Sequence, residues 1–322
     1  MCRAIVEYLA HLQSECLDHE WQQWLIRPVT SGNNRVYRVT RDSDDWAVKF
    51  AIRDNRDRAR REFNSLVFLD GLQAQIAPRP IHLDLDSYEQ AVVVQTWMPG
   101  TPLWSPPQDD ATWLEILHTY RRLHLLQPAG GTRWDSSDGP VLSPLTPDDT
   151  RASIHEFSQK IPPAGQSERL TGLIQMLDRF TLPTTPESLC WAHGDPNIRN
   201  LILTADGIKL VDWEYSGISD PTVEIAKLMS HSNAAMAGEE RWAWVAEQYA
   251  ALSSGRDMLA RIQVMYALRL VGWCVRLLFG RHVLLRQPSV RLVGHGPEAE
   301  MSTLENIDLY FERAHDQLVR LG

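Results

Sequence analysis

The chain has 322 residues, 43% of them hydrophobic, and its 32 basic and 41 acidic residues give a formal net charge of −9 at pH 7. This negative charge, together with the lack of a long basic run, disfavours a nucleic-acid backbone as the main ligand. Glu7 and His11 interrupt the N-terminal segment where a signal peptide would need an apolar core, and the four cysteines show no paired metal-ligand spacing. We therefore expect a reduced, cytoplasmic protein, divided by its length into two lobes.

The first lobe, residues 1–98, is expected to be an antiparallel sheet with one helix. Residues 31–39 predict a turn followed by a strand, and residues 46–50 predict a strand that carries Lys49. Residues 55–71 place apolar side chains at helical intervals, with Glu62 at the border of the apolar face. Two further strands, at 80–85 and 91–97, form a hairpin closed at residues 86–89. Pro and Gly then mark a crossing to the second lobe at residues 95–100.

The second lobe, residues 99–322, is expected to be mainly helical, and residues 127–148 are expected to be irregular. Residues 264–280 are strongly apolar, but Arg269 and Arg276 interrupt them and the run is short for a membrane span, so they predict a buried core helix. Two other helices follow from apolar residues at three- and four-residue intervals. The first stripe comprises Trp113, Ile116, Leu117, Tyr120 and Leu123, and the second comprises Leu304, Ile307, Phe311, Ala314, Leu318 and Leu321.

The most informative segment runs from His193 to Asp212. It begins His-Gly-Asp-Pro-Asn-Ile-Arg-Asn and continues with two short apolar runs, residues 201–203 and 208–211, joined by Ala-Asp-Gly. An Asp-Gly pair between apolar runs is a strong hairpin signal. Asn200 then enters the first strand where Asp212 leaves the second, so the hairpin is expected to place these two residues side by side.

These residue types suit phosphoryl transfer from ATP. The reaction needs one carboxylate to orient the attacking hydroxyl and accept its proton, and an amide oxygen and a second carboxylate to hold Mg²⁺ on the phosphates. Asp195 precedes Asn200 by five residues, which is the interval of the kinase signature. We therefore predict that Asp195 is the catalytic base and that Asn200 and Asp212 bind the metal.

The loop at 193–200, followed by Val-Asp-Trp-Glu-Tyr-Ser-Gly at 211–217, resembles the aminoglycoside phosphotransferase and choline kinase superfamily, the small-molecule relatives of protein kinases. The resemblance implies an α+β, protein-kinase-like bilobal fold and ATP and Mg²⁺ as cofactors. It implies that Lys49 neutralises phosphate oxygens and that Glu62 positions Lys49. It also implies a nucleotide-covering turn and an adenine-binding hinge, formed by Ser31, Gly32, Asn33 and Asn34 and by Gln95, Trp97 and Met98, respectively.

Two departures from the protein kinases qualify the resemblance. The turn contains a single glycine, although asparagine also tolerates positive φ angles. Trp and Glu follow Asp212 where protein kinases have Phe and Gly, which argues against a protein substrate. His193 is expected to fix the loop, and Arg199 either adds positive charge near the γ-phosphate or lies on the surface.

The acceptor is expected to be a small molecule with a hydroxyl group. The run after Asp212 resembles the choline kinase side of the superfamily, which favours a choline-like amino alcohol or an aminoglycoside; an amino acid, a thiamine-like cation and a neutral sugar remain open. Asp220-Pro221, with Glu224 in the next turn, is also a common helix start. Candidate acceptor-lining residues are Trp213, Glu214, Asp220, Tyr266 and Trp273.

Two alternative functions compete with the kinase interpretation. Asp84, at the end of an apolar stretch, could be the nucleophile of an aspartyl-phosphate hydrolase, but it lies in a predicted hairpin and not before a crossover helix. A catalytically silent protein of the same fold would bind nucleotide without transferring phosphate. Because every catalytic position carries the required residue type, we favour an active kinase. The sequence leaves the oligomeric state open.

Overall fold

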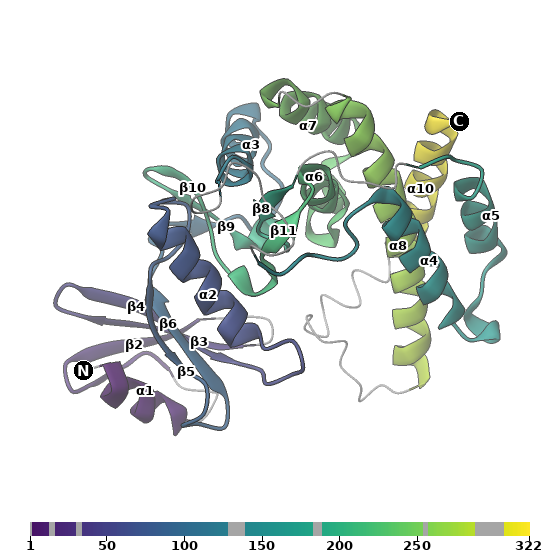
Figure 1. Ribbon diagram of the computed structural model, residues 1–322. Helices are drawn as coiled ribbons and strands as arrows, with labels where there is room; N and C mark the ends of the chain where they lie inside the picture. The colour runs from purple at the N-terminus through teal and green to yellow at the C-terminus, as the bar shows by residue number, and fades with distance from the viewer. Residues whose placement is uncertain are drawn as a thin grey trace. The chain divides into compact units, whose positions relative to one another are not determined.

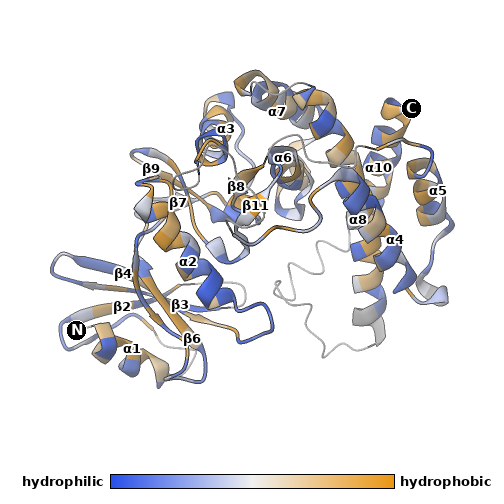
Figure 2. Cartoon of the chain, viewed as in Figure 1, coloured by the Kyte–Doolittle hydropathy of each residue, from blue (hydrophilic) through white to orange (hydrophobic). Residues whose placement is uncertain are grey.

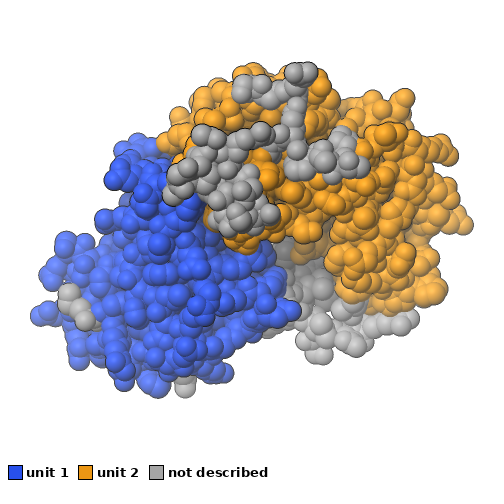
Figure 3. Space-filling view, viewed as in Figure 1, with its two compact units in different colours: residues 1–102, 200–216 blue, residues 103–199, 217–322 orange. Residues whose placement is uncertain are grey.

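The computed structural model describes residues 2–12, 17–29, 34–127, 139–182, 189–253, 257–286 and 306–322 (Figure 1). The chain forms two compact units (Figure 3). Unit 1 comprises residues 1–102 and 200–216, and unit 2 comprises residues 103–199 and 217–322. The hairpin after Asn200 was expected in the second lobe, but it belongs to unit 1. It does so because Leu210 N donates a hydrogen bond to Ile76 O at 2.7 Å, and because its first strand pairs with residues 101–102.

Unit 1 is built on a six-stranded antiparallel sheet in the order β1-β2-β3-β4-β6-β5. Two helices pack against it, α1 (Cys2–Ala10) and α2 (Arg58–Gly71). The hairpin expected at 80–97 is confirmed as the pair β5 and β6. The strands are β1 (His19–Trp21), β2 (Trp24–Val29), β3 (Arg35–Arg41), β4 (Asp44–Ala51), β5 (Pro80–Asp84) and β6 (Ala91–Thr96).

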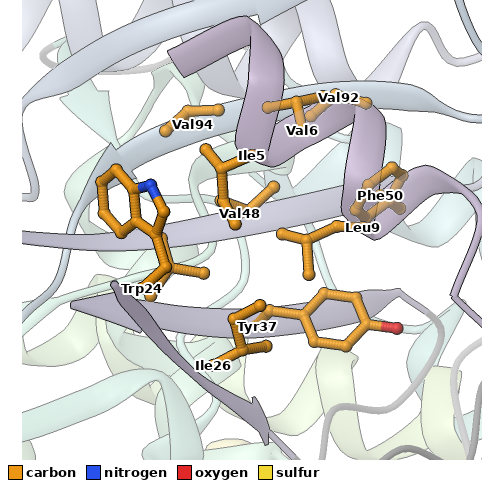
Figure 4. Packing of buried hydrophobic residues seen from close by; sticks show 11 residues of the cluster. Ile5, Val6, Leu9, Trp24, Ile26, Tyr37, Val48, Phe50, Val92 and Val94 are labelled. Carbon is orange, nitrogen blue, oxygen red and sulfur yellow. The ribbon is translucent and has the colours of Figure 1, made fainter. Parts of the chain in front are cut away.

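The two faces of this sheet bury different groups. Ile5, Val6 and Leu9 of α1 pack against one face, where alternate residues of β4 and β6 point toward them (Figure 4). On the other face, α2 packs through Ala59 and Phe63 against Ala51, Ala91 and Val93. Lys49 and Ala51 are two residues apart in β4, and residues two apart in a strand point to the same face of the sheet. Lys49 therefore lies on the α2 face.

A second, smaller sheet in unit 1 contains the hairpin predicted after Asn200. Its strands are β9 (Leu201–Thr204) and β10 (Gly207–Leu210), with Thr204 opposite Gly207, and β7 (Thr101–Pro102) pairs with β9. Gly100, at φ 153°, allows this pairing because a Cβ there would lie 2.4 Å from Leu203 O. The predicted hairpin is thus confirmed, but its second strand is shifted by one residue: Gly207, expected in the turn, begins β10, and the register places Val211, one residue before Asp212, opposite Asn200.

Unit 2 is mainly helical, with a two-stranded sheet of β8 (Cys190–Ala192) and β11 (Gly217–Ser219). The longest helix, α8 (Met258–Arg286), packs against α4, α6 and α10. The five stripe residues predicted between 113 and 123 are all buried in α3. The helices are α3 (Asp110–His124), α4 (Pro147–Gln159), α5 (Glu168–Leu177), α6 (Pro221–Ser230), α7 (Glu239–Leu252), α8 and α10 (Ile307–Leu321).

The apolar helix α8 lies where the sequence predicted a core helix. By length and composition its stretch Met258–His282 could cross a membrane, but 61% of the most apolar window is buried within the protein, as in the core helices of globular proteins. Polar as well as apolar residues lie along it (Figure 2). The last helix begins at Ile307, and Leu304 and most of the segment expected to be irregular, 128–138, lie outside the described residues.

Candidate active site

The core of the site in unit 1 is the buried ammonium group of Lys49. Its Nζ lies 2.7 Å from Glu62 Oε2, forms an ion pair with Asp212, and lies 3.8 Å from Glu214 Oε2. Strand alternation turns Lys49 toward α2, and the second turn of α2 carries Glu62 toward the sheet. The structure thus brings together the lysine, the glutamate and the second aspartate that the sequence singled out.

Electrostatics explain why these charges can be buried together. Burial alone would lower the pKa of Lys49, but the charges of Asp212, Glu62 and Glu214 outweigh it and raise the pKa above its usual value. Burial raises the pKa of Glu62, against the opposing attraction of Lys49. The ammonium group therefore stays protonated at neutral pH and remains available to neutralise phosphate oxygens.

A second buried ion pair supports this cluster and was missed from the sequence. Arg58 Nη1 donates to Glu214 Oε1 at 2.7 Å, and Arg58 Nε donates to Asp54 Oδ2 at 2.9 Å. The side chains of Arg58 and Glu214 are only 2% and 4% exposed. Arg58 precedes Glu62 by one helical turn, so the sequence could have indicated that both face the sheet. Three neighbouring arginines made Arg58 hard to single out.

Asp212 and Asn200 meet at the open end of the β9–β10 hairpin. Val211 N donates to Asn200 O at 3.0 Å, so the backbones of the two predicted metal ligands are adjacent, as expected. Asp212 itself adopts a left-handed conformation, with φ 70°, which is uncommon for a residue other than glycine and frequent at functional sites. An amide oxygen and a carboxylate are suitable Mg²⁺ donors.

The carboxylates around Lys49 also resemble a metal cluster. Oxygen atoms of Glu62, Asp212 and Glu214 lie within 4.8 Å of one another. The ammonium group of Lys49 already neutralises this group of charges, because it pairs with Glu62 and Asp212. Asn200 with Asp212 stays the predicted donor set for Mg²⁺.

Asp195 belongs to unit 2, in the loop that leaves β8. Glu224 of α6 holds this loop: its Oε1 accepts from Gly194 N at 2.7 Å and its Oε2 accepts from His193 N at 3.1 Å. His124 Nε2 lies 2.8 Å from the same Oε2. Burial would raise the pKa of Glu224, but the hydrogen bond and charge of His124 lower it below its usual value. Glu224 is thus an ionised, buried anchor one residue from Asp195.

Other contacts within unit 2 hold the loop around His193, which was expected to have a structural role. His193 is fully buried, in line with a structural role. Asn197 Oδ1 accepts from Arg199 N at 3.1 Å and from Asn233 Nδ2 at 2.9 Å. Arg199 is exposed, and its guanidinium lies 6.0 Å from the ring of Trp104. Its predicted role near the γ-phosphate stays a prediction.

The predicted nucleotide contacts are only partly described. Ser31, Gly32 and Asn33 lie outside the described residues, whereas Asn34 Oδ1 accepts from Ile52 N at 3.2 Å and so links the turn to the end of β4. At the expected hinge, Trp97 N donates to Asp45 O at 2.8 Å, which occupies that amide, and Gln95 is buried. Met98 lies outside any helix or strand. Adenine binding here stays a prediction.

The predicted acceptor residues largely make structural contacts. Trp213 is fully buried, and its Nε1 donates to Leu210 O at 2.9 Å. Asp220 caps α6, accepting from Thr222 N at 2.9 Å, and pairs with Arg261. Tyr266 and Trp273 are 2% and 7% exposed; the Tyr266 hydroxyl donates to Glu239 at 2.8 Å, and Trp273 packs on Tyr310 at 5.6 Å between ring centroids. Glu214 belongs to the Lys49 cluster.

Asp84, the nucleophile of the alternative hydrolase hypothesis, is a turn residue. Its Oδ1 accepts from the backbone N–H groups of Asp86 and Ser87 at 3.1 and 2.8 Å. It thereby closes the connection between β5 and β6, a common use of aspartate in turns. This contact accounts for Asp84 without catalysis.

Known proteins resemble this chain in sequence and in fold. The sequence profile of the phosphotransferase enzyme family matches residues 25–263. The thiamine kinase of Shigella boydii serotype 4 is 31% identical over 209 residues, which span 62% of this chain and 65% of that protein, slightly less than two thirds of its length.

Two solved structures share the fold. The choline kinase of Cryptosporidium parvum superimposes with a TM-score of 0.63 at 13% identity, over 100% of this chain and 96% of that one. Spectinomycin phosphotransferase, in complex with ADP and spectinomycin, gives a TM-score of 0.61 at 10% identity, over 98% of both chains. The α+β, protein-kinase-like fold predicted from the sequence is confirmed.

Proposed function

The chain belongs to the phosphotransferase enzyme family, and from this membership we propose that it transfers the γ-phosphoryl group of ATP to a hydroxyl group of a small molecule. The observation that carries the proposal is the buried cluster of Lys49, Glu62 and Asp212, with Nζ 2.7 Å from Glu62. A buried lysine paired with a helix glutamate and next to a metal-binding aspartate is the arrangement that phosphoryl transfer requires.

On the nucleotide side, Lys49 neutralises phosphate oxygens while Glu62 holds its ammonium group in place. Asn200 and Asp212 would hold Mg²⁺, which supplies positive charge to the phosphates when it is bound. The Arg58–Glu214 pair fixes α2 to the 3-10 helix that follows Asp212, residues Trp213–Tyr215, and so keeps Lys49, Glu62 and Asp212 in register. These residues position charge, which is the main source of catalysis in this reaction.

On the acceptor side, Asp195 orients the hydroxyl and accepts its proton as the bond to phosphorus forms. Glu224 fixes the adjoining backbone through His193 and Gly194, so that the carboxylate is held at a set position in its loop. Placement of this kind accounts for a large share of the rate, because an error of about 1 Å costs roughly a hundredfold in turnover.

The acceptor is a small alcohol. Thiamine, choline and spectinomycin are named with the relatives, and these cationic or polar alcohols head the panel to be assayed. The test is an ADP-release assay with Mg-ATP over thiamine, amino alcohols, aminoglycosides, amino acids, hydroxy acids and sugars. We expect release that depends on one class of alcohol and falls by several powers of ten in Asp195→Asn. Equal release in that variant would refute the mechanism.

A catalytically silent protein of the same fold is the second candidate. It would bind Mg-ATP in calorimetry yet release no ADP with any alcohol of the panel. Binding of nucleotide that is unchanged in Asp212→Ala would favour it, because the kinase assignment requires Asp212 to hold the metal.

A further inference from the structure

The loop that leads from α2 to β5 borders a cavity that the proposed chemistry does not use. The cavity has a volume of about 440 Å³ and is lined by eight residues between Leu69 and Arg79, so it lies wholly within unit 1. Its volume falls in the range of small-molecule sites, roughly 300–1,000 Å³. We call it the α2–β5 cavity.

The lining of the α2–β5 cavity combines buried apolar groups with exposed charged groups. Leu69 is 2% exposed and Pro78 is buried, whereas Asp70 and Arg79 are exposed. The two charged side chains line the same cavity, yet they form no ion pair with each other or with any other residue that the structure describes. Two opposite charges of this kind suit a ligand that carries both a cationic and an anionic group.

Two further lining residues adopt an uncommon backbone conformation. Gln73 and Gln75 have φ angles of 52° and 53°, in the left-handed region that favours glycine. Local hydrogen bonds enforce this course of the chain, from Gln73 N to Asp70 O at 2.9 Å and from Ala74 N to Leu69 O at 3.0 Å. Strained residues of this kind cluster at ligand-binding sites. A lining that is already fixed also lowers the entropic cost of binding a ligand.

The same loop connects three elements of the proposed nucleotide site. Arg79 N donates to Thr96 Oγ1, and Thr96 N donates to Arg79 O, each at 2.9 Å, which ties the loop to the expected hinge. Leu210 N donates to Ile76 O at 2.7 Å, which ties it to the β9–β10 hairpin. The third element is α2, which carries Glu62 and ends where the loop begins. A ligand that stiffens the loop therefore acts on groups that are proposed to bind Mg-ATP.

We propose that the α2–β5 cavity is a regulatory site for a free amino acid with an apolar side chain. Asp70, in the last turn of α2, pairs with the ammonium group, which the dipole of the helix C-terminus also favours. Arg79 pairs with the carboxylate, for which its planar guanidinium is suited. The apolar side chain packs against Leu69 and Pro78. The effect of this ligand on nucleotide affinity rests on the proposed kinase function, whereas its binding does not.

Calorimetric titration of the whole protein with leucine, alanine and glycine tests the binding. Two analogues of leucine serve as matched probes: isoamylamine lacks the carboxylate, and 4-methylpentanoate lacks the ammonium group. We expect leucine to bind more tightly than glycine, and each analogue to bind about tenfold to a hundredfold more weakly than leucine, the effect of a lost charged hydrogen bond. Either analogue binding as tightly as leucine would overturn the inference, as would the absence of binding by all three amino acids.

Substitutions at the two charged positions locate the site. Asp70→Asn and Arg79→Gln should each lower the affinity for leucine by at least about tenfold. Asp86→Asn and Arg3→Gln, at exposed positions of unit 1 outside the cavity, should leave it unchanged. Circular dichroism of each variant confirms that it is folded. An affinity for leucine that is the same in both cavity variants as in the parent would place leucine elsewhere and overturn the inference.

The regulatory effect is measured on nucleotide binding. Saturating leucine should change the Kd for Mg-ATP by at least about fivefold, and Mg-ATP should change the Kd for leucine by the same factor, because coupling between two sites is reciprocal. Equal Kd values for Mg-ATP with and without leucine would overturn the regulatory role. A protein that binds leucine but no Mg-ATP would instead count against the kinase function.

Discussion

Replacement of Glu224 by glutamine tests whether this residue anchors the catalytic loop. Both carboxylate oxygens accept hydrogen bonds, Oε1 from Gly194 N at 2.7 Å and Oε2 from His193 N at 3.1 Å. The glutamine amide has one acceptor and one donor, so in either orientation its NH₂ group must face a backbone N–H. The variant therefore loses at least one charged hydrogen bond and leaves a buried donor unpaired.

The size of the effect follows from those two losses. A hydrogen bond to a charged group contributes about 1.5–3 kcal/mol, and an unpaired buried donor costs about 1–3 kcal/mol. Glu224→Gln should therefore lower the free energy of unfolding by about 2.5–6 kcal/mol, which lowers the melting temperature of unit 2 by about 5–24 °C. Turnover should fall by roughly a hundredfold because Asp195 is the next residue after Gly194.

Scanning calorimetry and the ADP-release assay measure the two effects. Glu247→Gln, a change at an exposed position of α7, is the matched control and should shift stability by less than about 0.5 kcal/mol. The pKa of Glu224 is lowered in the folded state, so its stabilising charge is lost as the pH falls through that lowered pKa. The difference between the parent and Glu224→Gln should shrink over the same range. Equal stability of the Glu224 and Glu247 variants at neutral pH would refute the anchoring role.

Three further outcomes are expected. Arg58→Met leaves Glu214 buried without its 2.7 Å partner, so urea unfolding should show a free energy of unfolding lower by about 3–5 kcal/mol. Arg60→Met, which removes an exposed pair on the same helix, should lower it by less than about 1 kcal/mol, and equal losses in the two variants would contradict the role given to burial. Lys49→Met leaves buried carboxylates without their ammonium partner, and their pKa values rise on folding. The melting temperature of this variant should therefore decrease from pH 5 to 8, and a melting temperature that does not change over this range would contradict the proposed charge cluster. Burial and the charge of Arg269 lower the pKa of Lys227 to about 8, so the free energy of unfolding should rise between about pH 8 and pH 10 in chemical denaturation. Lys227→Met should lose this rise, and a rise that persists in the variant would exclude Lys227 as its source.

Local patterns in the sequence determined the hairpin and the position of two predicted metal ligands. The Asp-Gly turn and its flanking apolar runs set the register of β9 and β10, and this register makes Asn200 the neighbour of Val211. Helical spacing predicted that Glu62 lies at the border of the apolar face, and the family resemblance made it the expected partner of Lys49, which the 2.7 Å contact confirms. These contacts follow from backbone periodicity over short segments.

Contacts between distant segments were decided by the tertiary structure. Arg58 and Glu214 are 156 residues apart, and Glu224 bonds to a loop amide 30 residues away. No periodic pattern encodes such pairs, because each depends on how whole elements pack. Packing also buried Trp213 and paired Asp220 with Arg261, so residues chosen for their chemistry became part of the framework. The sequence by itself thus predicted the chemistry at phosphorus, and only the tertiary structure decided which charged groups pair with one another, since burial and partner choice are properties of the packed chain.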